Sequence, residues 1–170
     1  MALPFVRRGD RLLDVGCYDR SLIDRVLPRI ESAVGIDTNV ASSSEGRVEM
    51  LRGRFPDDRR FDDACFDCIT LLAVLEHVDD PALLATECER ILAPGGRLVL
   101  TVPHQRVDVV LDVLMFLGLA DGMAAEEHHG FDVEATRSLF ETAKLSLFQE
   151  RRFQLGLNRL YVFEKPRLVT

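Results

Sequence analysis

Short apolar runs alternate along this chain with segments whose apolar residues recur at helical spacing, and this alternation constrains the fold more than any other feature. The short runs predict buried β-strands, and the segments between them predict amphipathic helices. Strands that are joined by helices form a mainly parallel sheet with helices on both faces. The predicted strands are Arg11–Val15, Ala33–Asp37, Val48–Leu51, Phe66–Leu72, Arg97–Val102, Leu145–Phe153 and Leu160–Glu164. We therefore expect a doubly wound α/β fold with seven strands.

Turn and capping residues add detail to this expectation. Asp80 followed by Pro81 is typical of an N-cap and the first residue of a helix. Further apolar helical faces are expected over residues 22–30, over 107–117 and after Asp132. Because a short loop separates the last two predicted strands, they should form a C-terminal antiparallel hairpin.

Length, charge and cysteine content limit the class of protein. A chain of 170 residues with 47% apolar residues fits one domain, residues 1–170. The net charge of -7 and the absence of a Lys/Arg block argue against nucleic-acid partners. No run of eighteen uncharged apolar residues occurs, so we expect no stable membrane insertion. Four cysteines without a disulfide-like spacing favour reduced thiols in the cytoplasm.

Two residues at predicted strand ends indicate a nucleoside ligand. Gly16 follows the first strand, where a glycine lets the backbone approach a ligand closely. Asp37 ends the second strand, and an acid there can accept both hydroxyls of a ribose. A dinucleotide would need two further glycines for its pyrophosphate, and Tyr18 and Arg20 stand in that turn instead. A nicotinamide oxidoreductase is therefore disfavoured.

Several motifs occur in an order that resembles a known family. Leu12-Leu13-Asp14-Val15-Gly16-Cys17 resembles motif I of the class I S-adenosylmethionine-dependent methyltransferases, and Gly35-Ile36-Asp37 resembles their ribose-binding segment. Phe66-Asp67-Cys68-Ile69, Leu75-Glu76-His77-Val78 and Leu92-Ala93-Pro94-Gly95-Gly96-Arg97-Leu98 are similar to later blocks of that family. Together the motifs cover about residues 11–103. The resemblance is to methyltransferases of type 11, with a degenerate glycine motif.

The resemblance implies a Rossmann-like fold, S-adenosylmethionine as cofactor and methyl transfer to a small-molecule or lipid-precursor acceptor. His77 is the first candidate for a catalytic base and Glu76 the second, although both can equally belong to a capped helix start. His104 and His129 are candidates to face the substrate. The implied cofactor-binding residues are Asp14, Gly16, Cys17, Tyr18, Asp37, Thr38, Gly53, Phe55, Leu72 and Val74.

Departures from the family pattern support an alternative. Tyr18 and Arg20 stand where the family commonly has glycine, and Arg54 stands where it typically has aspartate. A catalytically weak or inactive binding module that supports a partner protein would tolerate these changes. Only about ten residues precede the first predicted strand, so we expect the helix over 107–117, a second copy in a homodimer or a partner chain to cover the cofactor.

A metal site is not expected. Cys65 and Cys68 lack a second cysteine pair, and a structural zinc site normally needs four ligands. Adjacent histidines such as His128 and His129 in a polar segment are more often solvated. We therefore expect the cysteines to be reduced and to contribute to core packing.

Overall fold

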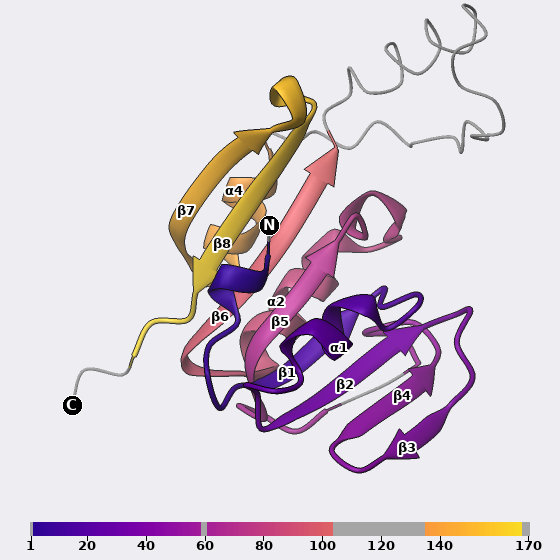
Figure 1. Cartoon of the computed structure of the whole chain (residues 1–170). Coiled ribbons are helices and arrows are strands. Elements are labelled where there is room, and N and C mark those ends of the chain that lie inside the picture. Colours follow the sequence, from indigo (N-terminus) through magenta and orange to yellow (C-terminus); the bar gives the residue numbers. More distant parts are fainter. Residues whose placement is uncertain (1, 59–60, 104–134, 168–170) are drawn as a thin grey trace, which may run out of the picture.

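An eight-stranded sheet forms the centre of the molecule, in the order β3-β4-β2-β1-β5-β6-β8-β7 (Figure 1). The structure is a computed structural model that describes residues 2–58, 61–103 and 135–167. The strands are β1 (Arg11–Val15), β2 (Ser32–Asp37), β3 (Ser43–Glu45), β4 (Val48–Arg52), β5 (Phe66–Leu72), β6 (Leu92–Pro103), β7 (Ser146–Phe153) and β8 (Asn158–Glu164). Strands β4, β2, β1, β5 and β6 are parallel to their neighbours in this group.

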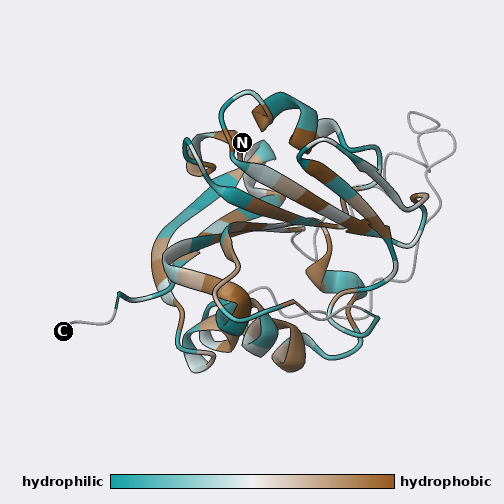
Figure 2. Cartoon of the chain, turned by 90° about the horizontal axis from the view of Figure 1, so that it is seen from below, coloured by the Kyte–Doolittle hydropathy of each residue, from teal (hydrophilic) through white to brown (hydrophobic). Residues whose placement is uncertain are grey.

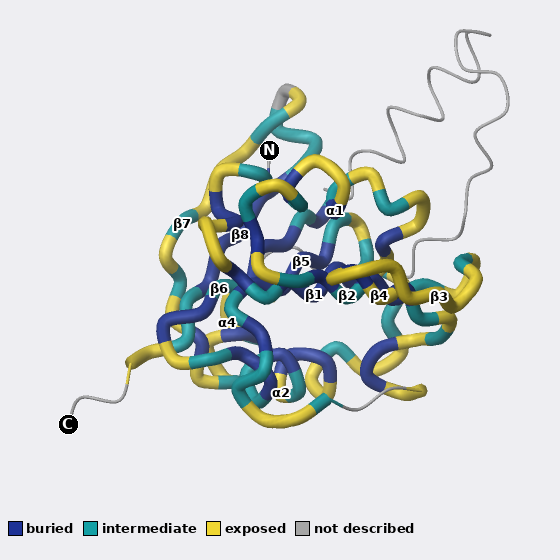
Figure 3. The backbone as a smooth tube through the Cα atoms, turned by 60° about the horizontal axis from the view of Figure 1, so that its bottom comes forward, coloured by how far each residue is buried: buried dark blue, intermediate teal, exposed yellow. Residues whose placement is uncertain are grey.

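Helices cover both faces of the sheet, which confirms the doubly wound α/β class. Figure 3 shows α1 (Ser21–Val26) on one face, and α2 (Pro81–Ile91) and α4 (Ala135–Thr142) on the other. The described residues also form short 3-10 helices, which are η1 (Leu3–Phe5), η2 (Leu75–His77) and η3 (Gln154–Gly156). Two cores result: Leu13, Leu71 and Phe140 belong to the α2 and α4 side, and Leu12, Ile23 and Cys68 to the α1 side. Loops between the elements are mostly hydrophilic (Figure 2).

All seven predicted strands are present, and the antiparallel pairing of β7 with β8 confirms the C-terminal hairpin. The eighth strand is β3, which pairs antiparallel with β4 at the edge of the sheet. Its three residues are all exposed. Because a polar edge strand of this length has no apolar alternation, the sequence pattern predicts a loop there.

Three of the four predicted helices correspond to described helices, α1, α2 and α4. Asp80 caps α2, since its side chain accepts a hydrogen bond from the Leu83 N–H at 2.9 Å, and Pro81 is the first helical residue. Helix α1 ends at Val26, ahead of Pro28. The helix predicted over 107–117 lies outside the described residues. None of the helices in the described part of the chain has the length and apolar character needed to cross a membrane.

The strand order places a crevice between β1 and β5. The chain runs outward from β1 through β2 and β4 on one side, and outward from β5 through β6 on the other. Connections that leave a parallel sheet in opposite directions open a crevice at the carboxyl ends of the central strands, where ligands of such folds bind. The expected functional residues therefore lie where β1, β2, β4 and β5 end.

Candidate functional site

A cavity of about 470 Å³ lies at the carboxyl ends of β1, β2, β4 and β5. This volume is in the range of small-molecule sites. Its lining comes from all four strand ends, so that residues far apart in the sequence meet at one edge of the sheet. The lining residues are Val15, Gly16, Ile36, Asp37, Thr38, Asn39, Gly53, Arg54, Phe55, Asp57, Ala73, Val74, His77, Val78 and Asp79.

Gly16 forms the turn that follows β1. Its N–H donates to the Ile36 carbonyl at 2.8 Å, and its φ of +70° lies in the left-handed region. A Cβ atom at this position would lie 2.5 Å from Cγ2 of Val74. Glycine is therefore required twice, by the backbone conformation and by the close approach of the segment after β5.

The Asp37 carboxylate lies at the edge of the cavity and is held by two backbone donors. Its Oδ2 accepts from the Tyr18 N–H at 3.1 Å, and its Oδ1 accepts from the Asn39 N–H at 2.8 Å. An ionised carboxylate offers about four lone-pair positions. The two backbone donors fix the orientation of the carboxylate, and each oxygen retains a further position that can accept a hydroxyl group.

The segment after β4 forms the wall on the far side of Asp37. The Gly53 N–H donates to the Asp37 carbonyl at 3.1 Å. Phe55 lines the cavity, and only 4% of its surface is exposed. Arg54 pairs with Asp79 at 3.6 Å, which brings the wall close to the segment after η2. The wall thus combines the apolar ring of Phe55 with the charged side chain of Arg54.

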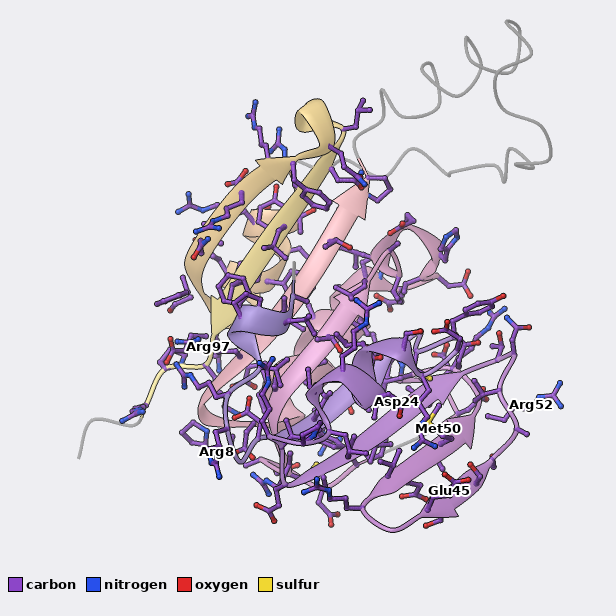
Figure 4. The ribbon with its side chains drawn as sticks, in the orientation of Figure 1. Arg8, Asp24, Glu45, Met50, Arg52 and Arg97 are labelled. Carbon is purple, nitrogen blue, oxygen red and sulfur yellow. The ribbon has the colours of Figure 1, made fainter. Side chains whose placement is uncertain are left out.

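Tyr18 and Arg20 do not line the cavity. Both adopt left-handed backbone conformations, with φ values of 43° and 66°. The Arg20 guanidinium donates to Asp24 on α1 and to Glu45 on β3, each at 2.9 Å, and Figure 4 labels these two acids on their elements. Neither side chain therefore fills the site, and the backbone at both positions has the left-handed shape that glycine favours.

Besides Tyr18, three of the expected cofactor residues lie beside the cavity rather than in its wall. Asp14 is buried below the turn, and its Oδ1 accepts a hydrogen bond from the Thr70 hydroxyl at 2.5 Å. Cys17 is buried against Gly35 and Met50, and burial raises the pKa of its thiol to about 12, so that it stays protonated. Leu72 packs against the core on the α1 side.

Other expected residues are distributed as follows. His77 is exposed and lines the cavity from η2, whereas Glu76 is half-buried outside the lining. Thr38, Gly53, Phe55 and Val74 all line it. His104 and His129 lie outside the described residues. Ala73 lies within the segment 72–74 that was expected to close one side of the site. Sequence reasoning missed Asn39, Asp57, Val78 and Asp79, and their position next to predicted site residues was the signal available.

Metal-ligating geometry is not found in the described residues. No group of three or more His, Cys, Asp or Glu side chains there can hold a metal ion. Cys65 and Cys68 are free thiols, and Cys68 is fully buried in the core. The cavity instead offers the Asp37 carboxylate as a hydrogen-bond acceptor, next to the close turn at Gly16.

Burial of Asp14 makes the stability of the fold dependent on pH. Desolvation raises the pKa of this carboxyl to about 6. A carboxyl whose pKa is higher in the folded than in the unfolded chain holds its proton more tightly when folded, so stability falls as pH rises from about 4 to 6. We expect Asp14→Asn, which keeps an acceptor for Thr70, to unfold like the wild type near pH 4 but to be about 2–3 kcal/mol more stable at pH 7. Urea unfolding at both pH values measures this, and parallel pH profiles would contradict it.

Gly16→Ala should be destabilising through contact with Val74. Gly46→Ala is the matched control, because Gly46 also has a positive φ, +60°, but has nothing within 4 Å of the added Cβ. Both variants lose about 1–2 kcal/mol to backbone strain. Overpacking should cost Gly16→Ala about 1–3 kcal/mol more. Urea unfolding measures the difference, which Val74→Ala in the same chain should remove; equal losses in the two single variants would show that the turn has room.

Comparisons with known proteins identify the family of this chain. The family model described as a methyltransferase domain matches residues 2–154. A ubiquinone biosynthesis O-methyltransferase of Pseudomonas aeruginosa is 33% identical over 102 residues, which cover 55% of this chain and 44% of that protein. The protein of the same name from Paracidovorax citrulli is 27% identical over 169 residues, covering 91% of this chain and 71% of that protein. The chain thus spans less than half the length of the Pseudomonas relative.

Solved structures share the fold. The complex between the Haloferax volcanii Trm112 methyltransferase activator and a methyltransferase contains a chain with a TM-score of 0.75 and 18% identity, covering 95% of this chain and 85% of that one. A SAM-dependent methyltransferase from Methanosarcina mazei has a TM-score of 0.70 and 19% identity, with 97% and 96% covered. The match of the family model over nearly the whole chain shows that it belongs to the methyltransferase domain family.

Proposed function

We propose that this chain binds S-adenosylmethionine in the strand-end cavity and transfers its methyl group to a hydroxyl of a small-molecule or lipid-precursor acceptor. The observation that carries the proposal is the Asp37 carboxylate, oriented by two backbone N–H groups at the edge of a 470 Å³ cavity. Relatives named as ubiquinone biosynthesis O-methyltransferases support an oxygen acceptor on a small molecule.

The residues of the cavity fit the cofactor as follows. Asp37 would accept the two ribose hydroxyls, Gly16 would let the backbone pass close to the methionine part, and Phe55 with the wall after Gly53 would flank adenine. When bound, S-adenosylmethionine supplies a methyl group that its positively charged sulfur already activates. The chain therefore has mainly to bind, orient and exclude water, and positioning of this kind supplies a large part of a rate enhancement.

His77 is the proposed base of the reaction. It lines the cavity from η2 and is exposed on its open side, where an acceptor would enter. A hydroxyl is a poor nucleophile until its proton is removed, and an imidazole nitrogen within hydrogen-bond reach can take that proton. Glu76, on the same short helix but outside the cavity lining, is the second candidate and would act through its neighbour.

An inactive binding module is not favoured. The named relatives are enzymes, and neither Tyr18 nor Arg20 extends into the cavity.

The open side of the cavity, with exposed Thr38, Asn39 and Asp79, supports the further proposal that a second copy or a partner chain covers it. One structural neighbour was solved with an activator protein. Light scattering on the purified chain tests the homodimer, for which a monomer at all concentrations would be contrary evidence.

Cytoplasmic location is proposed on the state of the thiols. All four cysteines are free, and Cys68 and Cys88 are buried where burial raises the thiol pKa. Reduced, buried thiols are usual in reducing compartments. Thiol counting after denaturation of freshly purified protein should give four reactive groups.

Calorimetric titration tests the proposed function. The chain should bind S-adenosylhomocysteine in a one-to-one complex and should not bind NAD at the same concentrations. A screen of small hydroxyl-bearing acceptors should then show transfer of label from the cofactor. Absence of S-adenosylhomocysteine binding would overturn the cofactor assignment, whereas binding without transfer to any acceptor would favour the binding module.

A further inference from the structure

Ala73 has an unusual backbone conformation at the edge of the cavity. It follows the last residue of β5 and lines the cavity, and its φ is +55°. Left-handed conformations cost an L-residue with a Cβ atom about 1–2 kcal/mol. Backbone strain of this kind persists only where the surrounding structure holds it, and it occurs often at functional sites. The question is which residue holds Ala73.

Thr101 on the neighbouring strand β6 supplies the restraint. The Ala73 N–H donates to the Thr101 carbonyl at 3.3 Å and to the Thr101 hydroxyl oxygen at 3.1 Å. The carbonyl bond continues the parallel pairing of β5 with β6, in which Leu72 is opposite Thr101. The hydroxyl adds a second acceptor at the point where β5 ends and the chain turns away. Figure 1 shows the two strands side by side at this edge.

The turn at Ala73 determines where Val74 lies. Val74 follows directly, lines the cavity and places its Cγ2 in the space that a Cβ of Gly16 would occupy. A line of contacts therefore runs from Thr101 on β6 through Ala73 and Val74 to the glycine turn after β1. Thr101 itself does not line the cavity, but this line of contacts connects it to Ala73, Val74 and Gly16, which do.

We propose that Thr101 is a positioning residue for the cofactor site, whose hydroxyl fixes the left-handed turn at Ala73 and so holds Val74 against Gly16. This inference rests on the proposed function, because the cavity that it shapes is the proposed cofactor site. Loss of the hydroxyl should leave the fold intact, since the carbonyl bond of the strand pair remains. Without the hydroxyl, Val74 should occupy a wider range of positions in the ligand-free protein. Ligand binding then has to order the segment that contains Ala73 and Val74, which weakens the affinity.

Two pairs of variants isolate the hydroxyl. Thr101→Val differs from the wild type by replacement of the hydroxyl with a methyl group, and Thr101→Ala differs from Thr101→Ser by the hydroxyl alone. Calorimetry should show that Thr101→Val binds S-adenosylhomocysteine about three- to tenfold more weakly than the wild type does. Thr101→Ala should bind it more weakly than Thr101→Ser by the same factor, about three- to tenfold. Thr86→Val is the matched control, because the Thr86 hydroxyl donates to a backbone carbonyl on α2, at 2.9 Å, away from the cavity.

Amide hydrogen exchange in the ligand-free protein gives a second measurement. The Ala73 N–H should exchange about tenfold faster in Thr101→Val than in the wild type, while amides within α2 keep their rates. If Thr101→Val fails to fold, the Ala and Ser pair decides. Equal affinity within either folded pair, or weaker binding without faster Ala73 exchange, would overturn the inference. A wild type that binds no S-adenosylhomocysteine would instead contradict the proposed function, and the exchange measurement would still test the restraint on Ala73.

Discussion

Asp37→Ala is expected to weaken S-adenosylhomocysteine binding by about a hundredfold, or 2.7 kcal/mol. The carboxylate is the charged acceptor for two ribose hydroxyls in the proposed complex, and hydrogen bonds to a charged group are worth about 1.5–3 kcal/mol each. The variant also removes the acceptor of the Tyr18 and Asn39 N–H groups, at 3.1 and 2.8 Å, so the two turns beside the ribose are less well held. Calorimetric titration at fixed salt measures the loss.

Asp24→Ala is the control for this experiment. Asp24 is an exposed acid on α1 that pairs with Arg20 and does not line the cavity. Its removal changes the net charge by the same amount as Asp37→Ala, and affinity should stay within about twofold because exposed pairs contribute little. Asp37→Ala that remains folded and binds S-adenosylhomocysteine within tenfold of the wild type would rule out the ribose assignment.

The central residues of the site could be predicted because their meaning depends only on where a strand ends. Gly16 directly follows the predicted strand Arg11–Val15, and Asp37 ends the predicted strand Ala33–Asp37. Parallel strands bring their carboxyl ends to one edge of the sheet. The structure places both in the cavity wall. The same argument covers Thr38, which follows Asp37 directly, and Val74, which lies two residues after the end of β5.

Other features depend on side-chain direction, which spacing alone does not give. Leu72 is the last residue of β5 and packs on the α1 side, whereas the chain turns at Ala73, with a φ of +55°, and Ala73 meets the cavity. Arg20 stands in the glycine turn, yet acids on α1 and β3 draw its guanidinium outward. Strand β3 could not be predicted, because three exposed polar residues carry no periodic signal.

The hydrogen bonds from Ala73 to Thr101 also could not be predicted from the spacing of residues. Alanine in the sequence gives no indication of a positive φ, and Thr101 in the middle of an apolar run indicates only a strand. Their connection comes from the register of β5 and β6, which pairs Leu72 with Thr101. The geometry of the site therefore depends on strand pairing as much as on the motif residues.

His77→Ala should lower the rate of methyl transfer to a hydroxyl acceptor by about a hundredfold, in the range typical for loss of a general base. Binding of S-adenosylhomocysteine should change by less than threefold, because His77 lines the cavity from η2 as an exposed residue, whereas the proposed cofactor contacts are made at Gly16 and Asp37 after β1 and β2. Single-turnover transfer, measured with saturating cofactor, separates the chemical step from binding. Added imidazole should restore part of the rate in His77→Ala, since a small base can occupy the space left by the side chain. Transfer at the wild-type rate in His77→Ala would show that another group accepts the proton. A variant whose cofactor affinity fell by the same factor as its rate would also remove His77 from the mechanism.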